Sequence, residues 1–251
     1  MLKVRIIPCL DIIKNKVVKG INFKNIRTLG DPVTLAKKYS DTGADELCML
    51  DITASHEKRK TFLKTVEAIA KVIDIPLTVG GGISDIKDIT TLLNAGADKV
   101  SINTTAVLKP NLIKVASIKH GSQCIVVAID GKRFGKQMLV TIKGGREKTN
   151  KNVVSWAKIV QKLGAGELLV TSMDTDGIQT GYDQEMLRAI NKEVSIPVIA
   201  SGGVGELKHF KEGYQTKATG LLAASVFHTS KFSIQQVKKY LEKEGVPVRI
   251  Q

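Results

Sequence analysis

The sequence predicts an α/β protein that forms one (β/α)8 barrel, the TIM-barrel fold, over residues 1–251. Short apolar runs alternate with longer amphipathic segments along the whole chain. Eight such strand–helix units in about 250 residues match the usual size of this barrel. Three segments also recur in one register, which indicates an internal repeat. A doubly wound open sheet built from the same units is the main alternative.

The eight predicted strands are rich in Val, Ile and Leu on both faces, as is typical of strands buried in a parallel sheet. They cover residues 4–10, 46–51, 76–80, 98–103, 124–130, 167–173, 197–201 and 219–224. In a (β/α)8 barrel these strands lie parallel, and their carboxyl ends form the face that carries the active site.

The segments between the strands carry apolar residues at helical spacing. Residues 31–43 illustrate the pattern, because Asp31 is a good N-cap, Pro32 suits the first helical position and Gly43 suits the C-cap. The same period predicts helices over residues 58–73, 84–96, 152–164 and 233–245.

The internal repeat divides the chain into two halves, approximately 1–122 and 123–251. The aligned segments are 43–53 with 164–174, 75–83 with 196–204, and 97–104 with 218–225. The first strands of the two halves pair Asp11 with Asp130. One register held over three separate segments predicts two half-barrels of four units each.

The composition excludes several classes of protein. The longest apolar runs are strand-sized, well short of the ~20 residues of a membrane span, and the chain enters its first strand without a signal-peptide pattern. We therefore expect a cytoplasmic protein with no membrane contact.

The net charge of +14 comes from lysines spread over the predicted helices. Aromatic residues make up only 4% of the chain, so we expect no nucleic-acid partner.

The metal-binding residue types show no ligand spacing. The cysteines Cys9, Cys48 and Cys124 are odd in number and lie in apolar runs, so we expect reduced thiols. The four histidines form no zinc motif either. The sequence therefore predicts neither a metal nor a cofactor.

Four aspartates stand at or just beyond predicted strand ends, namely Asp11, Asp51, Asp130 and Asp176. Any one of them has an ordinary alternative role as a helix N-cap or in a turn. The repeat places Asp11 and Asp130 on opposite sides of the barrel axis. Two facing carboxylates in different surroundings can act as acid and base.

Two glycine-rich segments, 79–84 and 200–205, each follow a strand and precede a helix. Exposed backbone amides in this context bind phosphate, although the glycines also suit a tight turn. Further donors are expected from Asn103, Thr104, Ala224 and Ser225. Lys19 is long enough to reach over the mouth. Two such sites on opposite sides indicate an elongated substrate with a phosphate at each end.

Four charged residues occupy strand starts and are therefore expected at the opposite, bottom end of the barrel. They are Arg5, Glu46, Lys99 and Glu167. From the residue types alone, a salt-bridge ring that stabilises the barrel is the simplest interpretation, because the bottom face of this fold mostly concerns stability.

A series of motifs resembles one known family. RIIPCLD, VVKG, DITAS, TVGGGI, GADKVSIN, GSQCIVVAID, GAGELL, IASGG and AASVFH follow one another through nearly the whole chain. Together they resemble the cyclase subunit of imidazole glycerol phosphate synthase, from histidine biosynthesis. The chain departs from the common pattern at Thr175, Ile178 and Ile21, which we expect to lie in two loops.

The resemblance implies an ammonia-dependent cyclase–lyase without a cofactor. A glutaminase subunit would form a heterodimer with the chain and supply ammonia through the barrel. The substrate would be a bis-phosphorylated ribulosyl-formimino-aminoimidazole carboxamide nucleotide. The products would be imidazole glycerol phosphate and aminoimidazole carboxamide ribotide.

The resemblance also implies roles for individual residues. Asp11 and Asp130 match the acid–base pair. One phosphate site matches Gly82, Asn103 and Thr104, and the other side matches Asp176, Gly177, Gly203, Ala224 and Ser225. The bottom ring matches a charged gate for ammonia, and Asp98 and Gln123 fall on the docking face for the glutaminase.

Two alternatives remain open at this point. The first is the sister half-barrel isomerase of the same pathway, which also uses two aspartates at strand ends. DITAS and the four-residue gate favour the cyclase. The second is a barrel without activity that only docks a glutaminase, and the retained aspartates and phosphate sites argue against it.

Overall fold

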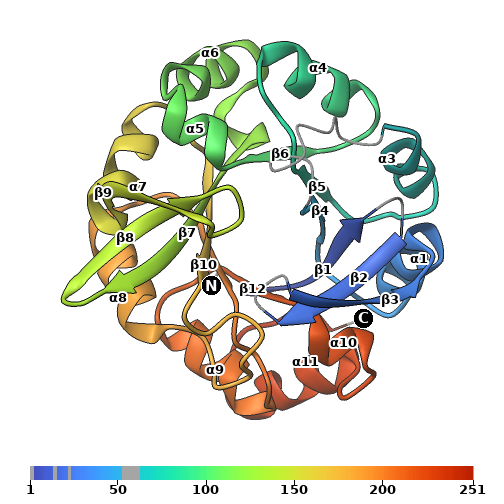
Figure 1. Cartoon of the computed structure of the whole chain (residues 1–251). Coiled ribbons are helices and arrows are strands. Elements are labelled where there is room, and N and C mark those ends of the chain that lie inside the picture. The colour runs from blue at the N-terminus through green and yellow to red at the C-terminus, as the bar shows by residue number, and fades with distance from the viewer. Residues whose placement is uncertain (1–2, 14–15, 22–23, 53–62, 251) are drawn as a thin grey trace.

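Eight parallel strands form a closed ring at the centre of the molecule, and the helices surround it (Figure 1). This computed structural model describes residues 3–13, 16–21, 24–52 and 63–250. The strands of the ring are β1 (Arg5–Ile13), β4 (Leu47–Asp51), β5 (Leu77–Gly80), β6 (Lys99–Ile102), β7 (Ile125–Phe134), β10 (Glu167–Ser172), β11 (Val198–Ser201) and β12 (Gly220–Ala223). The ring closes because β1 pairs with both β12 and β4, and β7 with both β6 and β10. The predicted barrel is confirmed, and an open sheet is excluded.

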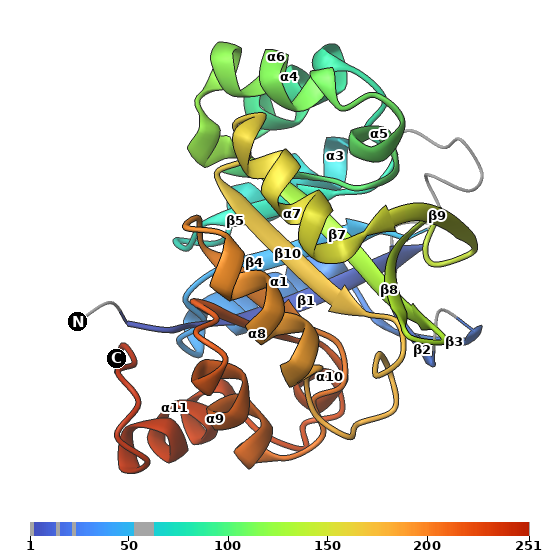
Figure 2. The same cartoon turned by 90° about the vertical axis from the view of Figure 1, so that its left-hand side faces the viewer.

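Each predicted strand overlaps one strand of the ring, but β1 and β7 continue further than predicted. Beyond the barrel they pair antiparallel with β2 (Lys16–Ile21) and β8 (Gln137–Ile142), which in turn pair with β3 (Lys24–Gly30) and β9 (Glu147–Asn152). These two extensions project from the end of the barrel opposite the chain termini (Figure 2). They were not predicted, because segments such as β9 have no continuous apolar face.

The strands β1 and β7 lie opposite each other, since each is four strands from the other around the ring of eight. Both begin a half of the chain, and both carry an antiparallel extension. The two-fold internal repeat would account for this arrangement. The repeat itself stays a prediction.

Helices follow the strands around the outside of the barrel (Figure 1). They are α1 (Pro32–Asp41), α3 (Leu63–Ala70), α4 (Ile86–Asn94), α5 (Thr104–Leu108), α6 (Asn111–His120), α7 (Val153–Lys162), α8 (Gln184–Glu193), α9 (Leu207–Gln215), α10 (Ser225–His228) and α11 (Ile234–Lys243), with one 3-10 turn at Ser122–Cys124. Each predicted helix is found, although residues 58–62 of the helix predicted over 58–73 lie outside the described part of the chain.

The residues that cap α1 agree closely with those predicted from the local sequence. The Asp31 side chain accepts a hydrogen bond from the Thr34 amide at 2.8 Å, and Pro32 is the first helical residue, as predicted. The C-cap is Thr42 instead of Gly43. Gly43 follows it with a φ of +88°, the left-handed conformation that glycine adopts readily just after a helix.

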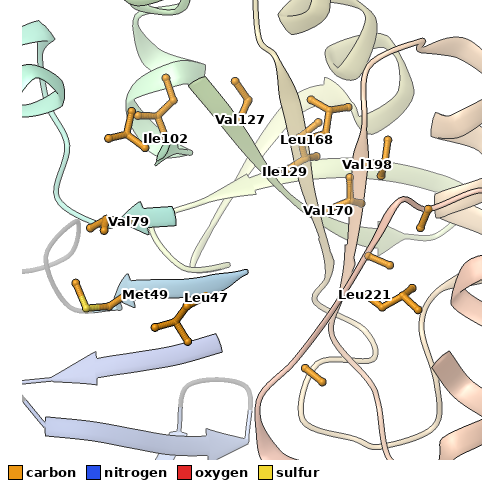
Figure 3. Packing of buried hydrophobic residues seen from close by; sticks show 14 of the residues in the cluster. Leu47, Met49, Val79, Ile102, Val127, Ile129, Leu168, Val170, Val198 and Leu221 are labelled. Atoms are coloured by element: carbon orange, nitrogen blue, oxygen red, sulfur yellow. The ribbon is translucent and has the colours of Figure 1, made fainter. Parts of the chain in front are cut away.

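Apolar side chains form an outer and an inner cluster, because alternate residues of each strand point to opposite faces. Leu168 and Val170 of β10 belong to the outer cluster, which includes helix residues such as Leu187 (strand members in Figure 3). Leu169 belongs to the inner cluster, with Ile7, Cys9, Cys48, Val126, Ile199 and Leu222. Each fully buried aliphatic side chain stabilises the fold by roughly 1.5–3 kcal/mol.

Within the described ranges, no helix is long and apolar enough to cross a membrane. In the same part of the chain, no group of three or more His, Cys, Asp or Glu side chains is placed to hold a metal ion. None of the three cysteines is joined to another in a disulfide. Cys9 and Cys48 are buried, whereas Cys124 is only half-buried.

Candidate active site

A cavity of about 480 Å³ opens at the carboxyl ends of the barrel strands, the end where this fold carries its active sites. The predicted site residues that line it are Asp11, Asp51, Gly82, Asn103, Thr104, Asp130, Asp176, Gly177, Gly203, Ala224 and Ser225. Lys19 belongs to β2, and its side chain lies outside the described part of the structure. No Lys or Arg is among the described residues that line the cavity.

The two predicted acid–base residues enter this cavity from opposite strands, Asp11 from β1 and Asp130 from β7. Asp11 is only 6% exposed, and the Cys9 thiol lies 3.8 Å from its Oδ1 as a weak donor. Asp130 is half-buried, and its Oδ2 accepts a hydrogen bond of 2.7 Å from the Asn103 amide. The carboxylates therefore meet in one cavity, but each in different surroundings.

The pKa of Asp130 is raised to about 7, because burial and, to a smaller extent, the charge of Asp176 together outweigh the opposing effect of the Asn103 hydrogen bond. Removing a carboxylate from water disfavours its charged form, and a nearby like charge acts in the same direction. A group that titrates near neutral pH can both give and take a proton under ordinary conditions. Asp130 is therefore suited to proton transfer.

The glycine segments bring bare backbone close to the cavity. A Cβ on Gly81 would lie 2.3 Å from the Asp51 carbonyl oxygen, and one on Gly203 would lie 2.1 Å from the Gly181 carbonyl oxygen. Both glycines also have φ angles near +100°, which other residues rarely adopt. Glycine is thus required at both turns for close approach as well as for conformation.

The helices that directly follow these glycine segments are already capped. Asp85 accepts hydrogen bonds from the amides of Lys87 and Asp88 at the start of α4. His209 accepts them from Gly205 and Glu206 at the start of α9. The short helices α5 and α10, by contrast, have no side-chain hydrogen bond at their N-caps, and their first residues line the cavity.

At the bottom of the barrel the four predicted charges form one ring. Arg5 contacts Glu46 at 2.7 Å and Glu167 at 2.5 Å. Lys99 contacts the same two glutamates at 3.0 Å and 2.8 Å. The glutamates are buried, with exposed fractions of 1% and 4%. The pKa of Arg5 is raised because attraction to both glutamates outweighs the effect of burial.

The sequence missed some members of both sites. Thr78 donates a hydrogen bond of 2.7 Å to Glu46 in the ring. Ser101, Thr171 and Ser201 line the cavity. Their signal is the period of two along each strand, since Ser101 of β6 stands two residues before Asn103, which directly follows the strand.

Three residues depart from the common pattern of the family that the chain resembles. Neither Thr175 nor Ile178 is among the described residues that line the cavity, and Ile178 is 50% exposed. Ile21 belongs to β2, and its side chain is outside the described part.

The two residues predicted for a partner interface flank the bottom of the barrel. Asp98 is exposed, and its carboxylate accepts a hydrogen bond of 2.8 Å from the Leu77 amide. Gln123 is exposed. Their role in docking stays a prediction.

A closed (β/α)8 barrel with carboxylates and glycine turns around a cavity at the strand ends has the architecture of a barrel enzyme. The family described as "Histidine biosynthesis protein" matches residues 5–233. The chain is 53% identical over 250 residues to imidazole glycerol phosphate synthase subunit HisF of Endomicrobium trichonymphae, covering 99% of this chain and 96% of the relative. It is also 53% identical over 246 residues to the HisF subunit of Campylobacter concisus (strain 13826), covering 98% of each. The chain belongs to the HisF family and is an enzyme of histidine biosynthesis.

Proposed function

We propose that this chain is the cyclase of an imidazole glycerol phosphate synthase. It would combine ammonia with a bis-phosphorylated ribulosyl-formimino-aminoimidazole carboxamide nucleotide, and release imidazole glycerol phosphate and aminoimidazole carboxamide ribotide. The observation that carries this proposal is the pair of carboxylates across one cavity, with a pKa of about 7 at Asp130. Membership of the HisF family selects the reaction.

The phosphates are expected at opposite sides of the cavity. One would lie near Gly82, Asn103 and Thr104, where α5 begins, and the other near Gly203 and Ser225, where α10 begins. Barrel enzymes often hold a phosphate between the last two strand loops and a short extra helix, and α10 corresponds to that helix. Backbone amides would carry this binding, with Lys19 as a further cation.

The carboxylates divide the proton transfers between them. Attack of ammonia on the ketose carbon gives an amino alcohol, and Asp11 would protonate its hydroxyl so that water leaves and an imine remains. Asp11 would then assist departure of the aminoimidazole product, and Asp130 would move the protons needed for ring closure. Each step transfers a proton to or from a group at the substrate, which is general acid–base catalysis.

The interior of the barrel connects the ring at its bottom to the cavity at its mouth. Between them lie the apolar side chains of the inner cluster, such as Ile7, Val126 and Leu222. Neutral ammonia can pass such a lining, whereas the ammonium ion would lose its hydration at a large cost. We propose that Arg5, Glu46, Lys99 and Glu167 gate this path.

A glutaminase partner would supply the ammonia at the bottom face, as the word "subunit" in the names of the relatives suggests. Asp98 and Gln123 would lie at that interface. We expect the complex in the cytoplasm, because cysteines that form no disulfide are typical of a reducing compartment.

The test is turnover of the bis-phosphorylated nucleotide by the isolated chain with ammonium salts, and again with the glutaminase and glutamine. Cyclisation is expected in both assays. Isomerisation of the aminoaldose precursor without any need for ammonia would instead assign the related isomerase reaction. Tight binding of the glutaminase without turnover in either assay would leave only a docking role.

A further inference from the structure

The loop between β10 and α8, residues 173–183, forms one wall of the cavity through Asp176 and Gly177. Backbone hydrogen bonds hold the middle of the loop, and in one of them the amide of Asp176 donates to the Ser172 carbonyl at 3.0 Å. The amide of Gly181 donates to the Gly203 carbonyl at 2.7 Å. The two ends of the loop depend on a different element, the extension of β7.

A single arginine of that extension contacts both ends of the loop. Arg133 stands three residues after Asp130 on β7, and its backbone amide donates to Asp174 Oδ2 at 2.9 Å. Its guanidinium makes a two-pronged contact with Asp183, in which Nη1 contacts Oδ2 and Nη2 lies 3.0 Å from Oδ1. Nη2 also lies 3.0 Å from Glu185. These contacts raise the pKa of the Arg133 guanidinium.

The Asp183 carboxylate is buried and hydrogen-bonded, unlike a typical surface carboxylate. It is 8% exposed, accepts a hydrogen bond of 3.1 Å from the Ser172 hydroxyl, and caps α8 through the Met186 amide at 3.0 Å. The guanidinium and the hydrogen bonds lower its pKa although burial opposes them. A two-pronged arginine–carboxylate pair fixes orientation as well as distance, which a lysine cannot do.

We propose that Arg133 is a positioning residue that holds the 173–183 loop against β7 and thereby places Asp176 beside Asp130. The contact joins the strand of one carboxylate to the loop of the other, so the Arg133 side chain contributes to the spacing between the two carboxylates. The relevance of this spacing to catalysis rests on the proposed function, in which Asp130 transfers protons.

The acidity of Asp130 reports on this spacing. Among the described residues that line the cavity with Asp130, the charged groups are Asp11 from β1, Asp51 from β4 and Asp176 from the loop, while Asn103, which follows β6, is neutral. The charge of Asp176 contributes to the raised pKa of Asp130. If the loop moves away, this contribution weakens, and the pKa of Asp130 falls.

The experiment is a carbon-13 NMR titration of the aspartate carboxyls in the full chain without substrate, with Asp130→Asn to assign the signal. In Arg133→Met, the pKa of Asp130 is expected to fall by about one unit. Asp176→Asn is expected to cause a similar fall, and the double variant no further one. Arg133→Lys keeps the charge without the two-pronged contact and should give an intermediate value. Lys158→Met, which removes an exposed ion pair with Glu193, is the matched control and should leave the pKa unchanged.

Activity gives a second measurement. A displacement of about 1 Å in a catalytic constellation costs up to about a hundredfold in rate, so kcat with ammonium salts should fall about tenfold or more in Arg133→Met, with the pH profile moved to lower pH.

An unchanged pKa of Asp130 in folded Arg133→Met, even with a lower Tm, would overturn the proposal. Asp183→Asn breaks the same contact from the other side, keeps an N-cap for α8, and replaces Arg133→Met if that variant does not fold. Since the titration needs no substrate, a shifted pKa without any cyclase activity in the parent chain would support the loop contact and reject the proposed function.

Discussion

At the bottom of the barrel, Arg5 and Lys99 each contact both Glu46 and Glu167, whereas the cavity at the mouth is lined by aspartates and, among its described residues, by no Lys or Arg. The two ends share the same strands. On β1, Arg5 and Asp11 are six residues apart and point to the same interior face.

The charges at the two ends act differently. In the ring, opposite charges stabilise one another, whereas at the mouth like charges shift a pKa. In the ring, cations hold the buried glutamates in fixed geometry, so breaking a contact leaves a buried charge without its partner. At the mouth, burial and the charge of Asp176 raise the pKa of Asp130 to about 7. Changes at the bottom should therefore appear mainly in stability, and changes at the mouth in reactivity and in pH dependence.

The largest effect is expected at the mouth, in Asp11→Asn. The amide cannot transfer a proton, and general acid–base catalysis contributes ~10²–10⁴-fold. Turnover of the nucleotide with ammonium salts should fall by that factor, and the glutamine-driven reaction with it. Equilibrium binding of the substrate should change little, because the phosphate contacts are retained.

The matched control for this change is Asp41→Asn, the same substitution at an exposed residue of α1 that pairs with Lys37. It should retain full turnover. Near-normal turnover in Asp11→Asn would remove Asp11 from the mechanism and leave the cavity without one of its two assigned acid–base groups.

The second effect concerns stability and also belongs to the mouth. The pKa of Asp130 is raised in the folded state, so below about pH 4 the carboxyl is neutral in both states and costs nothing, and above about pH 7 its charge destabilises the fold. Each pKa unit is worth about 1.4 kcal/mol, so Asp130→Asn should gain roughly 4 kcal/mol over the parent at pH 8. The gain should vanish near pH 4.

Urea unfolding of both proteins across this pH range measures the difference. Asp41→Asn again serves as the control, with no pH-dependent gain expected. A constant difference between Asp130→Asn and its parent from pH 4 to pH 8 would show that the Asp130 carboxyl titrates at its ordinary pKa.

The barrel could be predicted because its determinants are local and repeated. Apolar runs of four to six residues between amphipathic segments specify buried strands and covering helices, and eight such units leave few other arrangements. The extensions of β1 and β7 could not be predicted in this way. β9, for example, reads EKTNKN and alternates between exposed and half-buried residues, so no apolar pattern marks it as a strand.

The site residues that lie at strand ends could be predicted from the sequence. Asp11 and Asp130 needed only the topology of the barrel to bring them into one cavity. Arg133 was not predictable, because its partners Asp174 and Asp183 are 41 and 50 residues away along the chain, and no local spacing relates them. Contacts between extensions and loops depend on the folded structure, whereas contacts between strand ends follow from the fold class.

The smallest of the three effects is expected in the ring. Lys99→Met removes a cation that contacts both buried glutamates, and Arg5 alone must then balance them. Loss of one partner from a buried ion pair costs 3–5 kcal/mol, and the partial exposure of Lys99 places this change near the lower limit, at about 3 kcal/mol. Urea unfolding at pH 7 measures this loss. If the ring also gates ammonia, the glutamine-driven and ammonium-driven rates should change by different factors.

Lys37→Met provides the comparison for this last change, because Lys37 makes a similar contact of 3.0 Å with Asp41 on an exposed helix face. Surface pairs of this kind contribute little, so its stability should stay within about 0.5 kcal/mol of the parent. Equal losses of stability in Lys99→Met and Lys37→Met would mean that the buried ring contributes no more to stability than a surface ion pair. Equal changes in the two reaction rates of Lys99→Met would restrict the ring to a structural role, because a gate acts on ammonia that enters from below and not on ammonium supplied at the mouth.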